Sequence, residues 1–100
     1  MTPLSADRLT SALAQLPNWQ HADDALHRTY HFASFREAIG FMVDAMEEID
    51  RLNHHPEWTN VYDRVTVRLT THDAGNRVTA QDIALAKQLD WCADMRGVPG

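Results

Sequence analysis

The stretch from residue 34 to residue 52 constrains the fold most, because its hydrophobic residues recur with the period of an α-helix. Ser34 and Glu37 have the spacing of a capping box, which starts a helix, and Pro56 prevents the helix from continuing far. The residues expected to form its buried stripe are Phe35, Ala38, Ile39, Met42, Val43, Met46 and Ile49. A long helix with one apolar side has to pack that side against a second layer.

Stretches in which hydrophobic and polar residues alternate lie on both sides of this helix, and alternation is the pattern of a strand with one buried face. The first covers residues 26–32, and the second covers residues 65–71. Each follows a shorter strand candidate, at 18–22 and 59–62, and a short polar turn separates the two members of each pair. The sequence therefore predicts two hairpins.

Two further helices are predicted at the ends of the chain. One covers residues 6–16, and the other starts at Thr79, has Asp82 in its first turn and runs to about Met95. Residues 96–100 are expected to form a frayed tail. The order α-β-β-α-β-β-α indicates a single α+β domain of 100 residues, in which helices cover one face of a four-stranded antiparallel sheet.

The charge balance argues against several classes of function. With 14 acidic and 9 basic residues the net charge is −5, so the chain lacks the excess of Lys and Arg with which proteins bind nucleic acid directly or bind anionic membranes. No apolar run approaches the ~20 residues of a membrane span. The single cysteine, Cys92, excludes an internal disulfide. Because the N-terminal residues lack the basic and apolar parts of a secretory signal, the cytoplasm is the expected location.

Six of the 100 residues are histidines, and some of them stand where strands begin or end. His54 and His55 precede Pro56, which holds His55 in an extended conformation, and His72 follows the second alternating stretch. Asp82 lies on the buried side of the last predicted helix, so it is either a helix cap or a partner that orients a polar group. If these elements meet, the imidazoles and the carboxylate suit proton transfer at neutral pH. The remaining histidines are expected on the surface or on a sheet face: His21, His27 and His31.

Two other interpretations of the histidines stay open at this point. His54 and His55 could cap the carbonyl groups at the end of the long helix, or they could join His72 as three ligands of a zinc ion. Against zinc, adjacent histidines rarely chelate one ion, and no predicted helix carries a His-x-x-x-His pair.

At these residues the chain resembles the pterin-4a-carbinolamine dehydratase family, also called 4a-hydroxytetrahydrobiopterin dehydratase. The residues that match the pattern of this family are Asp50, His54, His55, Pro56, Tyr62, His72 and Asp82. The resemblance covers roughly residues 18–95. It departs at Asp50, where many members have glutamate, at Thr70, where many have serine, and more strongly in the loop 73–78.

The resemblance implies an enzyme that converts 4a-hydroxytetrahydrobiopterin to quinonoid dihydropterin plus water, in tetrahydrobiopterin recycling, with neither a metal nor an organic cofactor. His54 and His72 are expected to be the acid/base pair, with His55 binding the ring, Asp82 holding an imidazole in its working tautomer and Asp50 polarising the histidine loop. The expected catalytic residues are His54, His55, His72 and Asp82. The expected substrate-binding residues are Asn53, His54, His55, Pro56, Trp58, Thr70, Thr71, His72 and Asp73.

The resemblance also implies association, because members of this family form homodimers or homotetramers. An alternative function is a non-catalytic dimerisation module that acts as a transcriptional coactivator by binding helices of a partner. An exposed Trp91 on the last helix would suit association with a partner or with a second copy.

Overall fold

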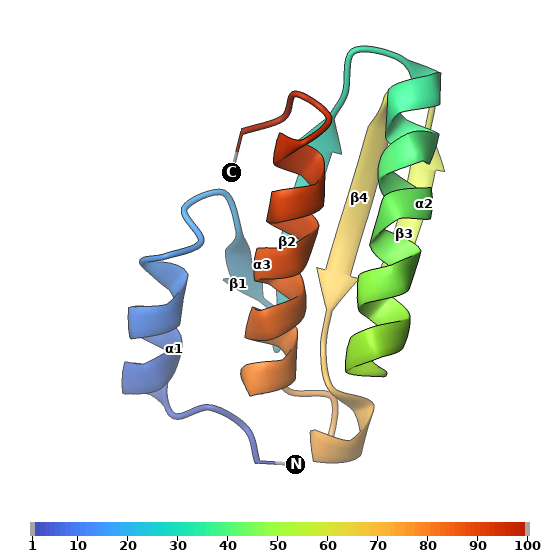
Figure 1. The fold of residues 1–100 in the computed structure, drawn as a ribbon. Helices are drawn as coiled ribbons and strands as arrows, with labels where there is room; N and C mark the ends of the chain where they lie inside the picture. Colours follow the sequence, from blue (N-terminus) through green and yellow to red (C-terminus); the bar gives the residue numbers. More distant parts are fainter. Residues whose placement is uncertain (1, 100) are drawn as a thin grey trace.

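The structure, a computed structural model, describes residues 2–99 and has the predicted order of helices and strands (Figure 1). The elements are α1 (Ala6–Leu13), β1 (Gln20–Ala22), β2 (Ala25–His31), α2 (Phe35–Leu52), β3 (Glu57–Val61), β4 (Arg64–Leu69), a short 3₁₀ helix (His72–Ala74) and α3 (Ala80–Asp94). No helix within the described residues is long and apolar enough to cross a membrane.

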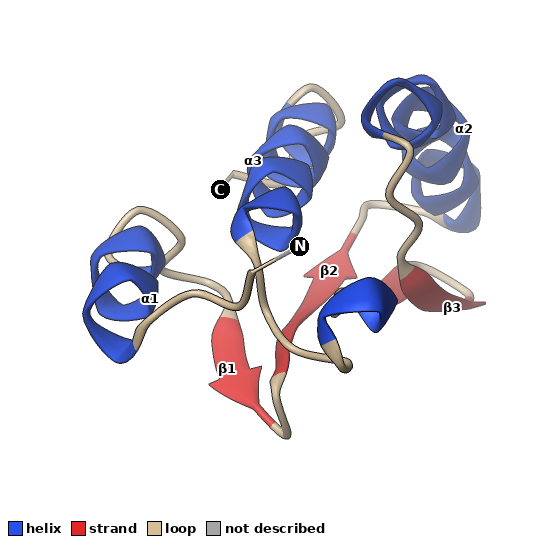
Figure 2. Ribbon diagram, turned by 90° about the horizontal axis from the view of Figure 1, so that it is seen from below, coloured by secondary structure: helices blue, strands red, loops and turns tan. Residues whose placement is uncertain are grey.

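The four strands form one antiparallel sheet in the order β1-β2-β4-β3. All three helices lie on the same side of it, as Figure 2 shows, and leave the other side open. This confirms the predicted α+β fold. In the register of β3 with β4, Glu57 stands opposite Arg68 and Thr59 stands opposite Thr66. Because side chains alternate along a strand, these four polar side chains share the open face.

The hydrophobic core fills the space between the sheet and the helices. An aromatic cluster forms its centre: the ring of Phe41 from α2 lies 4.9 Å from that of Tyr30 and 5.0 Å from that of Phe32, measured between centroids. Val65 and Val67 of β4 and Leu85 of α3 are fully buried around it. The predicted alternation of β2 and β4 therefore describes their buried faces correctly.

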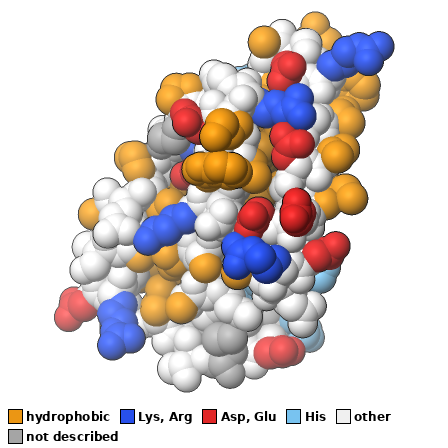
Figure 3. All heavy atoms as spheres, in the orientation of Figure 1, with side chains coloured by type: hydrophobic (Ala, Val, Ile, Leu, Met, Phe, Trp, Pro, Cys, Tyr) orange, Lys and Arg blue, Asp and Glu red, His pale blue; other side chains and the backbone are white. Residues whose placement is uncertain are grey.

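The predicted stripe of α2 is wrong in part. Phe35, Val43 and Met46 are each about half exposed or more, at 50%, 57% and 55%. Ala38 and Ile49 of the predicted stripe do face the core, together with Phe41 and Ala45, which the prediction left out. The reason is that the sheet and α3 contact only one side of α2, whereas the hydrophobic residues of α2 extend around the helix beyond that side. Figure 3 shows hydrophobic side chains exposed on the helix-covered face of the molecule.

α2 begins at its predicted cap, but only half of the capping box forms. The Ser34 hydroxyl accepts the Glu37 N–H at 3.1 Å, while the Glu37 carboxylate accepts from Arg96 at 3.3 Å. Arg96 also donates to Asp44 at 2.8 Å, and its guanidinium lies directly over Gly40, where an added Cβ would come within 2.4 Å of it. A side chain at position 40 would therefore require the Arg96 side chain to move.

In the tail, where fraying is expected, residues 96–99 make hydrogen bonds to the rest of the chain. The Val98 N–H donates to the Ala93 carbonyl at 2.9 Å, and the Pro99 carbonyl accepts from Arg28 at 3.2 Å. These bonds hold the chain against the end of α3.

A buried polar cluster around Asp90 was not predicted. One carboxylate oxygen, Oδ1 of Asp90, accepts from Trp19 at 3.0 Å, from Arg28 at 2.6 Å and from the Tyr30 hydroxyl at 2.6 Å. The Arg28 guanidinium lies 4.2 Å above the centroid of the Tyr30 ring, a cation–π distance. Burial, together with the neighbouring Asp90 carboxylate, raises the pKa of the Tyr30 hydroxyl far above its ordinary value. The cluster ties α3 to β2 and to the segment before β1.

Candidate active site

Five pieces of the chain meet at one end of the sheet, the lower end in Figure 1: the end of α2, the start of β3, the end of β4, the 3₁₀ helix and the start of α3. Asn53 allows the end of α2 and the start of β3 to lie close together. It caps α2 in the left-handed conformation, with φ at 49°, and its N–H donates to the Asp50 carbonyl. Asparagine tolerates this conformation better than most residues. The chain therefore turns sharply, and His54 follows at once.

His54 and Asp82 form the centre of the site. Nε2 of His54 lies 2.6 Å from Oδ1 of Asp82. Asp82 is completely buried, and His54 is 8% exposed. The other oxygen of Asp82, Oδ2, accepts the Thr79 N–H at 2.9 Å and the Thr71 hydroxyl at 2.7 Å. Asp82 thus serves both purposes that its position suggested, since it caps α3 and also orients a polar group.

A chain of hydroxyl groups supports this carboxylate. The Thr79 hydroxyl accepts the Gln81 N–H at 3.2 Å, which leaves its proton for the Thr71 hydroxyl at 2.7 Å. Thr71 in turn directs its own proton to Asp82. Sequence reasoning did not single out Thr79 for the site. The signal was present in the capping box of Thr79 with Asp82, which the structure confirms.

The second ring nitrogen of His54 reaches the surface. Nδ1 of His54 has no hydrogen-bond partner among residues 2–99. Every buried side-chain nitrogen or oxygen of a non-exposed residue in that range does have a partner. Nδ1 is therefore not one of the buried atoms. Because Asp82 accepts from Nε2, the proton of the neutral ring lies on Nε2 and Nδ1 carries the lone pair. Nδ1 of His54 can therefore accept a proton while Nε2 stays hydrogen-bonded to the carboxylate.

His55 points away from this pair. In an extended segment successive side chains lie on opposite sides, so His55 faces the open side of the sheet if His54 faces α3. Its side chain is 66% exposed, and its Nε2 lies 4.0 Å from Oδ1 of Asp50, whose side chain is 81% exposed. An exposed pair at this distance contributes little energy.

His72 lies in the 3₁₀ helix that follows β4, and it is exposed. Its Nδ1 is 3.2 Å from Oδ1 of Asn76. Since an amide oxygen only accepts, Nδ1 carries the proton and Nε2 is left with a lone pair. Asn76, a second residue that sequence reasoning missed, is itself held by its N–H, which donates to the Thr71 carbonyl at 3.0 Å. These hydrogen bonds connect Asn76 both to His72 and to the end of β4.

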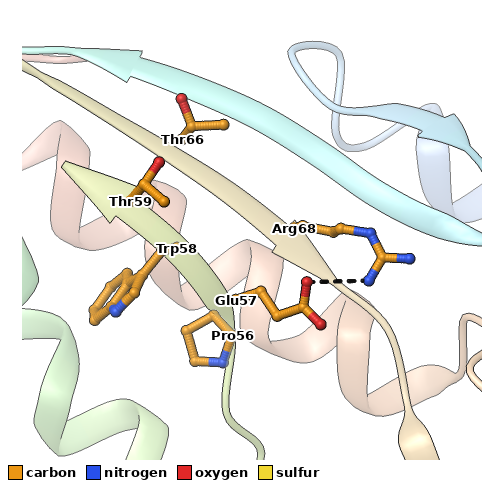
Figure 4. A pocket seen from close by; sticks show the side chains of 6 residues that line it. All are labelled: Pro56, Glu57, Trp58, Thr59, Thr66 and Arg68. Carbon is orange, nitrogen blue, oxygen red and sulfur yellow. Dashed lines mark hydrogen bonds and ion pairs between the residues drawn. The ribbon is translucent and has the colours of Figure 1, made fainter. Parts of the chain in front are cut away.

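The other residues expected to bind substrate are distributed around these three histidines. Pro56 and Trp58 line a cavity of about 430 Å³ on β3 (Figure 4). Trp58 is half-buried, and its ring packs edge-on against Phe41. The Thr70 hydroxyl donates to the Asp24 carbonyl at 3.1 Å, and Asp73 is exposed.

Some of the main chain here is already occupied. The Asn53 N–H donates to Asp50, and the Thr71 N–H donates to the Arg77 carbonyl at 3.0 Å. These two N–H groups are therefore not free to bind a ligand.

The three histidines are not arranged as ligands of one metal ion. In the part of the chain that the structure describes, no three His, Cys, Asp or Glu side chains are grouped closely enough to hold a metal. His54 directs one nitrogen to Asp82, and His55 faces the opposite side of the extended segment.

Comparison with known proteins agrees with the fold. Residues 2–92 match the family model described as pterin 4 alpha carbinolamine dehydratase. A protein of Opitutus terrae named "Putative pterin-4-alpha-carbinolamine dehydratase" is 55% identical over 89 residues, which are 89% of this chain and 92% of the relative. One of the same name from Solibacter usitatus is 49% identical over 92% of this chain and 96% of its own. The crystal structure of a transcriptional coactivator/pterin dehydratase from Brucella melitensis superposes with a TM-score of 0.87 at 39% identity, over 92% of this chain and 99% of that one.

Proposed function

The chain belongs to the pterin 4 alpha carbinolamine dehydratase family, and we propose that it removes water from a 4a-hydroxytetrahydropterin to give the quinonoid dihydropterin. The observation that carries the proposal is the His54–Asp82 pair, with Nδ1 of His54 accessible, at the same end of the sheet as the exposed His72. We place the reaction in tetrahydrobiopterin recycling. The free thiol of Cys92 suits a reducing compartment, so we propose the cytoplasm as its location.

The reaction needs two proton transfers. The C4a–O bond breaks as the electron pair of N5 forms a double bond to C4a, N5 loses its proton to a base, and the departing hydroxide takes a proton from an acid. The sum is one quinonoid dihydropterin and one water, without oxidation or reduction. Acid–base catalysis of this kind contributes about 10²–10⁴-fold.

His54 and His72 are the acid/base pair in this proposal. Both have a ring nitrogen that no described residue occupies, and in both a fixed partner sets the tautomer: Asp82 for His54 and Asn76 for His72. The Asp82 carboxylate holds the His54 ring in one orientation through Nε2. His55, exposed on the opposite side of the extended segment, binds and orients the pterin ring.

The test is a stopped-flow measurement with freshly generated 4a-hydroxytetrahydropterin. The protein should accelerate its disappearance over buffer in proportion to protein concentration, and treatment with EDTA should leave the rate unchanged. No acceleration would overturn the proposal. A rate that EDTA abolishes and zinc restores would replace the cofactor-free mechanism by a metal-dependent one.

We propose in addition that the chain forms a homodimer or homotetramer through α2. The supporting observation is that Phe35, Val43 and Met46 expose large hydrophobic side chains along this helix, since contiguous apolar surface of this kind marks an interaction site. The same surface could receive helices of another protein, as a coactivator would. Light scattering distinguishes the two: an 11.4 kDa species alone at micromolar concentration would count against self-association.

A further inference from the structure

Thr71 lies between the segments that carry the two histidines of the proposed mechanism. It follows β4, precedes the 3₁₀ helix that begins at His72, and is only 4% exposed. In Figure 1 the chain descends from β4 into this short helix and then returns to the start of α3, whose first turn contains Asp82. The resemblance implies that Thr71 binds substrate, whereas its polar groups all form hydrogen bonds within the protein.

The hydroxyl of Thr71 is linked to His54 through Asp82. An ionised carboxylate only accepts, so the single proton of this hydroxyl goes to Oδ2 of Asp82, at 2.7 Å. The Thr79 hydroxyl then donates to the Thr71 oxygen, also at 2.7 Å. Because the carboxylate cannot turn without leaving these buried donors unpaired, which is unfavourable, Oδ1 stays directed at Nε2 of His54.

The main chain of Thr71 is linked to the other ring through Asn76. Its carbonyl accepts the Asn76 N–H at 3.0 Å, and its N–H donates to the Arg77 carbonyl at 3.0 Å. Asn76 has a φ of 59°, a left-handed conformation that asparagine tolerates. Its Oδ1 atom lies 3.2 Å from Nδ1 of His72. The loop therefore closes on the end of β4 and presents an acceptor to His72.

We propose that Thr71 and Asn76 are positioning residues, each for one of the two rings. Thr71 orients His54 through Asp82, and Asn76 orients His72. The inference rests on the proposed dehydratase function, in which these rings are the acid/base pair. It moves Thr71 from substrate binding to the support of a ring that transfers a proton. Its second part concerns the loop 73–78, in which this chain departs most from the family pattern.

NMR spectra that correlate the ring nitrogens with the ring protons test the two roles separately. Recorded where the rings are neutral, they report which nitrogen of each imidazole holds the proton. In the wild type the proton should be on Nε2 of His54 and on Nδ1 of His72. Thr71→Val keeps the shape of the side chain without its hydroxyl, and it should change the His54 signals alone. Asn76→Gly keeps access to the left-handed conformation, and it should change the His72 signals alone.

Stopped-flow kinetics then measure the effect on the reaction. Thr71→Val and Asn76→Gly should each lower kcat by about fivefold, the value of one net hydrogen bond, and keep KM within about twofold of the wild type. Thr71→Ser retains the hydroxyl and should restore kcat. Tyr30→Phe is the matched control, because it removes another buried hydroxyl that donates to a carboxylate, that of Asp90 at 2.6 Å, outside the site. It should leave kcat and the imidazole signals unchanged.

The NMR measurement separates this inference from the proposed reaction, because it requires no turnover. If each variant changes only the signals of its own histidine, the positioning roles are supported even if no dehydration is seen. Wild-type His54 signals in Thr71→Val would overturn the role of Thr71, and wild-type His72 signals in Asn76→Gly would overturn that of Asn76. A Thr71→Val enzyme with a raised KM and an unchanged kcat would return Thr71 to substrate binding.

Discussion

Nε2 of His54 and Oδ1 of Asp82 lie 2.6 Å apart, although 28 residues separate them in the chain. The contact joins the turn after α2 to the first turn of α3. Thr71, from the end of β4, donates to the same carboxylate. One buried side chain therefore fixes the relative positions of three segments, and the two that carry His54 and His72 become neighbours.

Replacing Asp82 by Asn should lower both activity and stability. Three donors converge on the two carboxylate oxygens, and the amide has one oxygen, so a buried donor loses its acceptor at a cost of about 1–3 kcal/mol. We expect kcat to fall by about 10- to 100-fold, part of what acid–base catalysis supplies, and the pH profile of kcat to change shape. Asp90→Asn is the control, a partly buried acid of the same helix outside the site. An unchanged pH profile in Asp82→Asn would contradict a role in positioning His54.

His54→Ala should also affect both properties, for a related reason. It removes the imidazole that we propose for proton transfer, and it leaves a buried carboxylate oxygen without its donor. We expect a loss of about 1–3 kcal/mol in the free energy of unfolding, measured by urea denaturation, together with a large fall in kcat. Wild-type stability in this variant would mean that the 2.6 Å contact is not formed in solution.

His72→Ala should lower activity alone. The side chain is exposed and bonds only to Asn76 among the described residues, and substitutions at such positions change stability by about 0.5 kcal/mol or less. We expect kcat to fall by about 10²-fold or more with an unchanged thermal midpoint. His31→Ala, at an exposed position of β2, is the matched control and should keep full activity. Equal activity in the two variants would remove His72 from the mechanism.

The stability of the protein should fall above about pH 10 because of Tyr30. Burial and Asp90 raise the pKa of its hydroxyl from the ordinary value of 10.0, so the folded state holds the proton more tightly than the unfolded state. Below pH 9 both states are protonated and the contribution is constant. Above pH 10 the unfolded state ionises first, and the free energy of unfolding falls by up to about 1.4 kcal/mol per pH unit.

Denaturation at several pH values, with Tyr30→Phe and Tyr62→Phe compared, checks this. Only Tyr30→Phe should reduce the alkaline slope, since Tyr62 is 69% exposed. Burial also raises the pKa of the Cys92 thiol, which acts in the same direction in all three proteins and cancels in the comparison. Equal slopes in the two tyrosine variants would contradict the burial of Tyr30.

Met46→Glu should shift the protein toward the monomer if α2 forms the interface. A charge at the centre of an apolar contact would have to lose water without a partner, whereas in the monomer the side chain of residue 46 is exposed. Light scattering should show the change, and Glu47→Gln, at an exposed position next in the chain, should leave the assembly as it is. Assembly that survives Met46→Glu would place the contact elsewhere.

The order of helices and strands was predictable because local signals mark it. Ser34 and Thr79 are caps that the structure confirms, and the alternation of β2 and β4 is regular. The buried side of α2 was less predictable, because hydrophobic residues such as Val43 and Met46 extend the stripe past the side that the sheet covers. A pattern of apolar residues does not distinguish the side of a helix that packs against the core from a side that stays exposed.

The convergence of the site was not predictable from spacing. His54, Thr71 and Asp82 are distant in sequence, and only the register of β3 with β4 and the position of α3 bring them together. The cluster around Asp90 had a weak signal in Arg28, which occupies a buried-face position of an alternating strand. A charged residue at such a position needs a buried partner, but the sequence does not say which acid supplies it.

A functional carboxylate in a protein interior usually lowers stability, which sets up a trade-off between stability and activity. Asp82 largely avoids this conflict. Its Oδ2 atom accepts the Thr79 N–H in the first turn of α3, and Oδ1 of the same carboxylate orients His54. Under the proposed function, selection for a stable helix and selection for a competent imidazole act on the same residue in the same direction. In a domain this small, such sharing allows a buried acid to persist without compensation elsewhere in the core.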